Sequence, residues 1–265
     1  MKRQQSLGGG AERAYPLKGK GAILNRGFTL AEVLITLGII GVVAALTLPA
    51  LINKYQKVQY VTGLQKAYTV FNNGIKLLMA DTGCDDIKCT GLFEGSVEDS
   101  DFNDNMEKMV RKYFKVAKVC KYGNDSCAIM RHYLDGNESV VDFTNVFSFV
   151  TTDGITYRVD PIEASSPKEE GVSKIKYLLA VDIDINSNKK PNVIGRDIFY
   201  FRLAQDGVLY PYQGEEYAKY FGGASWQTTG HYWNLNSGIS CNPLKGSSGS
   251  GCAARIMENG WKMDY

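Results

Sequence analysis

The side chains best suited to bind a metal ion lie in one polar segment in the second half of the chain. Asp182, Asp184 and Asn186 alternate along a predicted strand, and Asp197 follows after Gly195. Alternation puts the first three on one face of the strand, and hard oxygen ligands of this kind suit Ca²⁺. The segment is not an EF-hand, because the glycine after the third ligand and the terminal glutamate are missing. It predicts either a calcium site or a polar turn whose Asp and Asn side chains bond their own backbone.

The six cysteines form three pairs of near neighbours, separated by four, six and ten residues. None of the pairs is a CxxC motif, and no two pairs have the spacing of a zinc ribbon. Short-loop disulfides are the simplest interpretation, and six reduced, buried thiols are the alternative. Because disulfides persist mainly outside the cytoplasm, we expect the body of the protein to be exported. The predicted pairs are Cys84–Cys89, Cys120–Cys127 and Cys241–Cys252.

Catalytic chemistry has little support in the sequence. The only histidines, His132 and His231, form no HExxH-like pair. We find no nucleophile next to a placed base, no phosphate-binding loop and no paired acids at an informative spacing. The sequence therefore favours a structural protein over an enzyme.

Residues 28–52 contain a single ionisable side chain, that of Glu32. As a helix these 25 residues would be about 37 Å long, enough to cross the roughly 30 Å hydrocarbon layer of a bilayer. Residues 1–27 contain six basic residues and one acidic residue, which leaves 24 basic and 27 acidic residues in the remainder. The positive-inside rule places this basic leader in the cytoplasm and the body outside.

Glu32 is the exceptional residue of this apolar segment. A carboxylate in a membrane span is costly, so it is expected to have a function and a partner. The alternative is a position near the cytoplasmic interface, where the cost is small.

Residues 26–32 read RGFTLAE, and VLITLGIIG follows at residues 33–41. This junction resembles the signature of the type IV prepilin family, which includes type IV pilins, type II secretion pseudopilins and competence pseudopilins. The resemblance implies that a prepilin peptidase cuts between Gly27 and Phe28, and that the new amino group of Phe28 is N-methylated. It implies that Glu32 pairs with the N-terminal amine of a neighbouring subunit, and Pro49 matches a proline that bends the long helix in this family. The leader of 27 residues is longer than usual.

The physical chemistry of the junction agrees with these roles. A glycine before the cut lets the backbone fit closely into a protease. A carboxylate and an ammonium group buried together in hydrocarbon neutralise one another, whereas each alone is costly. The segment 182–197 is also similar to a loop of some pseudopilin-type domains, with Asp184 and Asp197 as the firmest matches.

An amphipathic pattern follows the apolar segment. Apolar side chains recur at spacings of three and four residues, which predicts that the helix continues over residues 53–82 and buries one face on a sheet. Gly83 is expected to end the helix. The repeating residues are Val61, Leu64, Tyr68, Phe71, Ile75 and Leu78.

Residues 83–265 are expected to form a disulfide-stapled α+β domain. An apolar face over residues 102–114 predicts a short helix. Strands are predicted at residues 140–151, 155–159, 177–185, 198–203 and 208–210, with Asp-Gly turns at residues 153–154 and 206–207. The fold class is therefore α+β, with a long N-terminal helix packed on an antiparallel sheet of four or five strands, as in pilin-like proteins.

These observations predict a structural subunit, minor because its body is large, of a type IV pilus or a type II secretion pseudopilus. It would be a single-pass inner-membrane protein with an extracytoplasmic C-terminal domain. The expected partners are prepilin peptidase, other pilin or pseudopilin subunits, the inner-membrane assembly platform and membrane lipid. A competence pseudopilin that handles DNA is one alternative, disfavoured by the acidic body, from which no nucleic-acid binding is expected. The other is a membrane-anchored binding module or hydrolase that uses the signal only for export.

Overall fold

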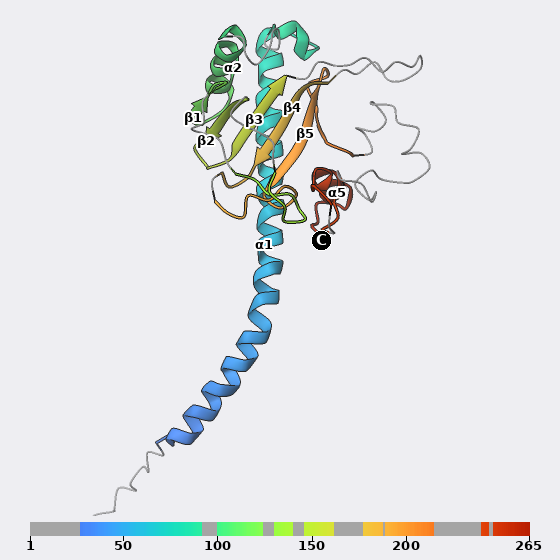
Figure 1. Cartoon of the computed structure of the whole chain (residues 1–265). Helices are drawn as coiled ribbons and strands as arrows, with labels where there is room; N and C mark the ends of the chain where they lie inside the picture. Colours follow the sequence, from blue (N-terminus) through green and yellow to red (C-terminus); the bar gives the residue numbers. More distant parts are fainter. Residues whose placement is uncertain are drawn as a thin grey trace, which may run out of the picture. The chain divides into compact units, whose positions relative to one another are not determined.

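A long helix followed by an antiparallel sheet defines the α+β architecture, which confirms the predicted fold class (Figure 1). The structure is a computed structural model that describes residues 27–91, 100–123, 130–139, 146–161, 177–187, 189–214, 240–243 and 246–265. Its helices are α1 (Leu30–Thr82), the 3₁₀ helix η1 (Ile87–Thr90), α2 (Ser100–Tyr113) and α5 (Cys252–Glu258). Its strands are β1 (Val116–Cys120), β2 (Phe147–Thr151), β3 (Thr156–Pro161), β4 (Tyr177–Asp184), β5 (Ile198–Ala204) and β6 (Leu209–Pro211).

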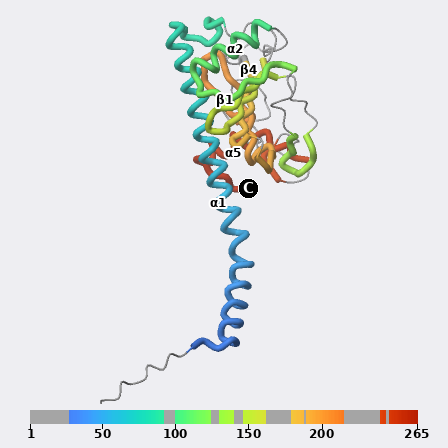
Figure 2. Tube along the Cα trace, turned by 90° about the vertical axis from the view of Figure 1, so that its left-hand side faces the viewer, coloured from blue at the N-terminus to red at the C-terminus, as the bar shows by residue number. Residues whose placement is uncertain are grey.

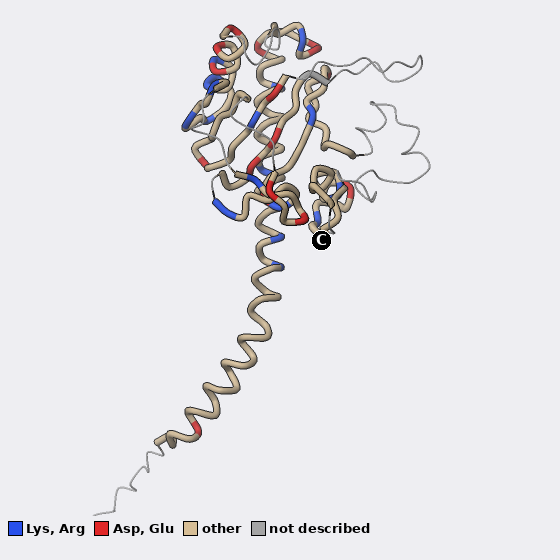
Figure 3. The backbone as a smooth tube through the Cα atoms, in the orientation of Figure 1, with Lys and Arg blue, Asp and Glu red and all other residues tan. Residues whose placement is uncertain are grey.

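The chain divides into two compact units, Met1–Pro49 and Ala50–Tyr265, and α1 contributes to both. In the described part of the first unit, residues 27–49, the side chains are exposed apart from half-buried Ala44. This part of α1 is apolar, as the long uncharged stretch of the tube in Figure 3 shows.

The second unit is built on a sheet in which every strand pairs with its neighbours in sequence, in the order β1-β2-β3-β4-β5-β6. All five pairings are antiparallel. Tight turns make this meander possible, and Gly154 and Gly207 adopt the positive φ angles that the β2–β3 and β5–β6 turns require.

The sheet has six strands, so the prediction of four or five was too low. The strand that the sequence analysis missed is β1, which was assigned to a connecting region. It has only five residues and lies at the sheet edge, with Lys118 exposed and Val116 half-buried. A short edge strand carries too little alternation to stand out in a sequence. Residues 140–145, the first half of another predicted strand, lie outside the described residues.

The second half of α1 packs on one face of this sheet (Figures 1 and 2). Its buried side recurs every three or four residues, as predicted, and faces the alternating apolar residues of β2 to β5. The Tyr157 hydroxyl donates to the Ala67 carbonyl oxygen at 3.0 Å, and the Leu209 amide donates to Asn72 Oδ1 at 3.2 Å. The buried residues of this helix are Val61, Leu64, Ala67, Phe71, Gly74, Ile75 and Leu78.

Four aromatic rings fill the space between α1, α2 and the sheet. Phe149 stacks on Tyr157 with ring centroids 5.0 Å apart, and Phe114 meets Phe149 at 5.1 Å. Phe71 on α1 contacts both Phe114 and Tyr157. Helix α1 accommodates this cluster only because Gly74 lacks a side chain, since a Cβ there would overlap the Phe114 ring.

We therefore predict that Gly74→Ala destabilises the domain by about 1–3 kcal/mol, although alanine favours a helix by about 1 kcal/mol over glycine. The matched control is Gly63→Ala on the same helix, whose added Cβ would lie 3.1 Å from the flexible Ile185 Cδ1. Thermal unfolding of the full chain in detergent, followed by near-ultraviolet circular dichroism, compares the two. Equal melting temperatures for both variants would contradict this account of the core.

Candidate functional site

The predicted cleavage junction lies just outside helix α1. Gly27, Phe28 and Thr29 are described and precede the first helical residue, Leu30. The Phe28 side chain is 88% exposed, and among the described residues no atom beyond the immediate neighbours lies within 4 Å of a Cβ built on Gly27. The Gly27–Phe28 bond is therefore accessible and non-helical, which is the form of backbone that a peptidase needs.

Glu32 takes part in a capping box at the start of α1. Its carboxylate oxygen Oε2 accepts from the Thr29 amide at 2.8 Å and from the Thr29 hydroxyl at 2.9 Å. The Glu32 amide in turn donates to Thr29 Oγ1 at 3.2 Å. This role of Thr29 was not predicted, although the T-x-x-E pattern of a capping box is present in RGFTLAE.

The capping box gives Glu32 a local partner within a single chain. It also holds the carboxylate next to Thr29, the residue that follows the predicted new terminus at Phe28. One glutamate can therefore cap its own helix and still point toward the end of the chain where an amine is expected. The two roles are separable by mutation, because glutamine also serves in a capping box but has no charge.

Beyond Glu32, α1 exposes a continuous apolar surface. One 18-residue window has a mean hydropathy of 2.4 with none of its residues buried, so by length and composition this helix could cross a membrane. Leu30, Ile40 and Leu46 are 78%, 62% and 75% exposed. Exposed apolar surface on this scale is unfavourable in water, so lipid or other protein must cover it.

The structure brings three of the four predicted calcium ligands into one turn between β4 and β5. Buried Asp197 accepts from the amides of Asn192 and Val193 at 2.9 and 2.7 Å, and from Asn186 Nδ2 at 3.2 Å. Asp184 Oδ1 accepts from the Asn186 amide at 3.2 Å. These bonds are the ones that the alternative interpretation, a polar turn, predicts.

Asp182, the fourth predicted ligand, is engaged elsewhere. On the face of the sheet opposite α1, its Oδ2 lies 2.9 Å from Nη1 of Arg131, which also donates to the Tyr200 hydroxyl. Arg158 on β3 lies beside Asp184, with 3.8 Å between Nη2 and Oδ2. The burial of Arg131 and Arg158 was not predicted, because nothing in the sequence around either residue indicates it.

Burial also changes the electrostatics of the turn. It raises the pKa of Asp184 to about 7, against the opposing effect of Arg158, and it raises the pKa of Asp197. Both carboxylates therefore ionise less readily than exposed ones, which weakens them as cation ligands. Within the described ranges, no three His, Cys, Asp or Glu side chains gather as metal ligands.

Thermal stability distinguishes the calcium site from the polar turn, the two interpretations that the sequence allows. To bind Ca²⁺, Asp197 would have to lose its hydrogen bonds from three N–H donors. We therefore expect the full chain to have the same melting temperature in calcium as in EDTA. A saturating ligand at about 100 times its dissociation constant would instead stabilise the fold by about 2.7 kcal/mol. Such a rise, abolished by Asp197→Asn, would establish the calcium site.

Disulfides close short loops within the second unit. The structure joins Cys84 to Cys89 and Cys241 to Cys252, which are two of the three predicted pairs. Cys120 is also disulfide-bonded, while Cys127, its predicted partner, lies outside the described residues. The first bridge follows the end of α1, and the second leads into α5.

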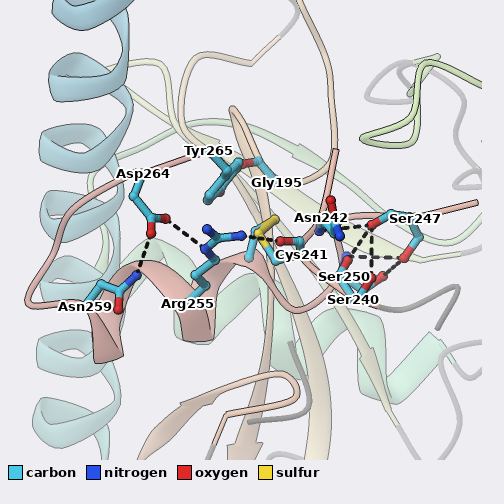
Figure 4. Close-up of a disulfide and its surroundings, with 12 residues drawn as sticks. Gly195, Ser240, Cys241, Asn242, Ser247, Ser250, Arg255, Asn259, Asp264 and Tyr265 are labelled. Carbon is cyan, nitrogen blue, oxygen red and sulfur yellow. Dashed lines mark hydrogen bonds and ion pairs between the residues drawn. A yellow bond between two sulfur atoms is a disulfide. The ribbon is translucent and has the colours of Figure 1, made fainter. Parts of the chain in front are cut away.

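The Cys241–Cys252 bridge belongs to a cluster that fixes the C-terminal segment (Figure 4). Arg255 on α5 donates to the Cys241 carbonyl oxygen at 2.7 Å and pairs with Asp264 at 2.8 Å. The Tyr265 hydroxyl donates to the Gly195 carbonyl oxygen at 2.5 Å. The last residues of the chain are thereby held against the β4–β5 loop.

Two family models match the chain, one at its N-terminal signal and the other over the second compact unit. Residues 24–48 match the model of the prokaryotic N-terminal methylation motif, which confirms the prepilin-like signal and identifies a pilin- or pseudopilin-like exported protein. Residues 50–265 match a family of unknown function, DUF6613, and the chain belongs to that family. This second match begins at the first residue of the second compact unit. No curated protein and no solved structure matches the chain.

Proposed function

We propose that this protein is a structural subunit, of the minor kind, of a type IV pilus or a type II secretion pseudopilus. The observation that carries the proposal is the methylation motif at residues 24–48, which includes the first part of an apolar helix that no described residue buries. Residues 28–52 hold the subunit in the inner membrane before assembly and pack among neighbouring subunits afterwards.

The direction of insertion follows from charge and redox chemistry. The basic leader favours a cytoplasmic N-terminus, which puts residues 53–265 on the extracytoplasmic side. The disulfides Cys84–Cys89 and Cys241–Cys252 are stable in that oxidising compartment. The machinery implied is a prepilin peptidase and an inner-membrane assembly platform.

The first test is processing. Co-expressed with a prepilin peptidase, the chain is expected to mature to a form that begins at N-methylated Phe28, as read by mass spectrometry of the intact protein. Gly27→Leu should remain uncleaved, because a branched side chain cannot fit where glycine lets the backbone approach the protease. The matched control is Gly21→Leu, the same change within the leader, which should be processed normally. A mature terminus other than Phe28 would rule the proposal out.

The second test separates the two roles of Glu32. Glu32→Gln keeps the capping geometry and removes the charge, whereas Thr29→Ala removes the cap and keeps the charge. In the proposed mechanism, Glu32→Gln leaves a neighbour's amine buried without a counter-ion, at a cost of about 3–5 kcal/mol. Losing the cap costs only about 1 kcal/mol.

Shearing cells and blotting the sheared and membrane fractions measures the difference. We expect Glu32→Gln in membranes but not in filaments, and Thr29→Ala in both. The reverse pattern, with filaments from Glu32→Gln and none from Thr29→Ala, would make Glu32 a helix cap only.

A further inference from the structure

A cavity of about 260 Å³ opens between the first turns of α1 in the second unit and the loops near the C-terminus. Figures 1 and 2 both place the C-terminal segment beside this part of α1. Since a water molecule in the liquid occupies about 30 Å³, the cavity has room for a polar group of several heavy atoms. Its polar lining comes from Asn53, Gln56, Lys57, Tyr60, Arg196 and Tyr265.

Two cations from different elements meet in this cavity. Lys57 comes from α1, and Arg196 comes from the β4–β5 loop. Among the described residues, neither side chain forms an ion pair. The nearby carboxylate of Asp197 is occupied by the amides of Asn192 and Val193. Lys57 and Arg196 therefore form no ion pair with the part of the chain that the structure describes, and the buried Asp197 carboxylate is a negative charge near the Tyr60 side of the cavity.

The remaining polar groups suit an anion with several oxygens. Asn53 and Gln56 each offer an amide NH₂ donor, and Tyr60 offers a hydroxyl. Lysine and arginine donors form charge-assisted hydrogen bonds to phosphate that are about twice as strong as neutral ones. The donor set therefore fits a phosphate group better than a neutral ligand.

The wall that carries Arg196 is held in place by the cluster around the C-terminal disulfide. Gly195, its neighbour, accepts from the Tyr265 hydroxyl and packs so closely on Cys252 that a Cβ there would lie 2.6 Å from the sulfur. Arg255 lies over the Tyr265 ring, 5.0 Å from its centroid. The backbone that positions Arg196 is thus fixed before any ligand binds, which lowers the entropic cost of binding.

The position of Lys57 along α1 determines how far the cavity lies from the hydrocarbon layer of the membrane. Lys57 lies five residues beyond residue 52, the end of the predicted membrane span, which is about 8 Å along a helix. The polar headgroup layer extends about 5–8 Å on each side of the hydrocarbon core. When residues 28–52 span the membrane, as the proposed function requires, a tilt fits this helix of about 37 Å to the hydrocarbon layer of about 30 Å, and the cavity lies at the level of the lipid headgroups.

We propose that this cavity binds the phosphate of an anionic phospholipid headgroup in the outer leaflet of the inner membrane. Lys57 and Arg196 bind the phosphate oxygens from two sides, and Asn53 and Gln56 add neutral donors. The bound headgroup couples the second unit to the membrane surface in a subunit that is not yet assembled. This inference rests on the proposed membrane anchoring of α1.

Native mass spectrometry of the full chain tests the inference. The protein is released from detergent micelles after titration with phosphatidylglycerol or with phosphatidylcholine, whose choline group cancels the phosphate charge. We expect one phosphatidylglycerol retained per chain with at least tenfold higher affinity than phosphatidylcholine, and at least tenfold weaker retention by Lys57→Gln/Arg196→Gln. The control is Lys54→Gln, which removes one positive charge one turn earlier on α1 at a residue outside the cavity lining and should retain the lipid as the natural chain does.

Each other outcome overturns the proposal. Equal retention by the double variant, or equal loss in Lys54→Gln, would mean that lipid is attracted by surface charge and not by the cavity. Displacement of the lipid by millimolar inorganic phosphate would assign the cavity to a soluble anion. Because Lys57 and Arg196 form no ion pair among the described residues, the double variant and the natural chain should have the same melting temperature in the absence of lipid.

Carbonate extraction separates this proposal from the proposed function. A chain that stays in carbonate-washed membranes but binds no phosphatidylglycerol loses only the headgroup site. A chain that carbonate removes from membranes is not anchored by α1, and the proposed function fails with it.

Discussion

One apolar stripe on α1 organises the second unit, because every strand that faces it is placed by the need to cover it. Leu64, Phe71 and Ile75 are almost completely buried, and they lie against alternating residues of the sheet. Burying one such side chain stabilises a fold by about 1.5–3 kcal/mol, so the stripe outweighs any single polar contact in the domain. The same helix has no such cover over residues 28–49. One helix therefore has two apolar parts. The second half is covered by the sheet of the same chain, and residues 28–49 need lipid or another protein to cover them.

The opposite face of the sheet is organised by charge. Arg158 on β3 and Arg131, which comes from the segment of residues 130–139, lie buried beside Asp184 and Asp182. That segment is bonded through His132 to the 192–194 loop and through Leu134 to Ser248. Buried ion pairs add little net stability, but removing one partner costs about 3–5 kcal/mol. The pairs therefore specify which loops cover this face more than they strengthen it.

The N-terminus combines a helix cap and the proposed assembly contact in few residues. Thr29 and Glu32 satisfy donors at the start of α1, where a helix leaves backbone N–H groups without partners. The same carboxylate is the one charge of the apolar segment. In the proposed function the same carboxylate would also pair with a neighbour's amine, so its bonds to Thr29 would satisfy it before assembly.

The sequence by itself determined the features that depend on near neighbours. The junction RGFTLAE, the three- and four-residue spacing of the α1 stripe and the pairing of Cys84 with Cys89 and of Cys241 with Cys252 all involve residues close along the chain. Periodicity also predicted four of the strands at nearly their observed bounds, since alternation is a local property. The capping box was equally readable, because its two residues are three apart.

Only the tertiary structure decided the features that join distant segments. Arg131 meets Asp182 across 51 residues of sequence, and this contact pairs one of the predicted calcium ligands with an arginine. Lys57 and Arg196 reach one cavity because the sheet returns the β4–β5 loop to the start of the domain and the C-terminal cluster holds it there. Strand β1 exists because β2 offers it a free edge, not because five residues prefer to be extended. Such contacts depend on how separate elements pack, and no local pattern of residue types encodes that packing.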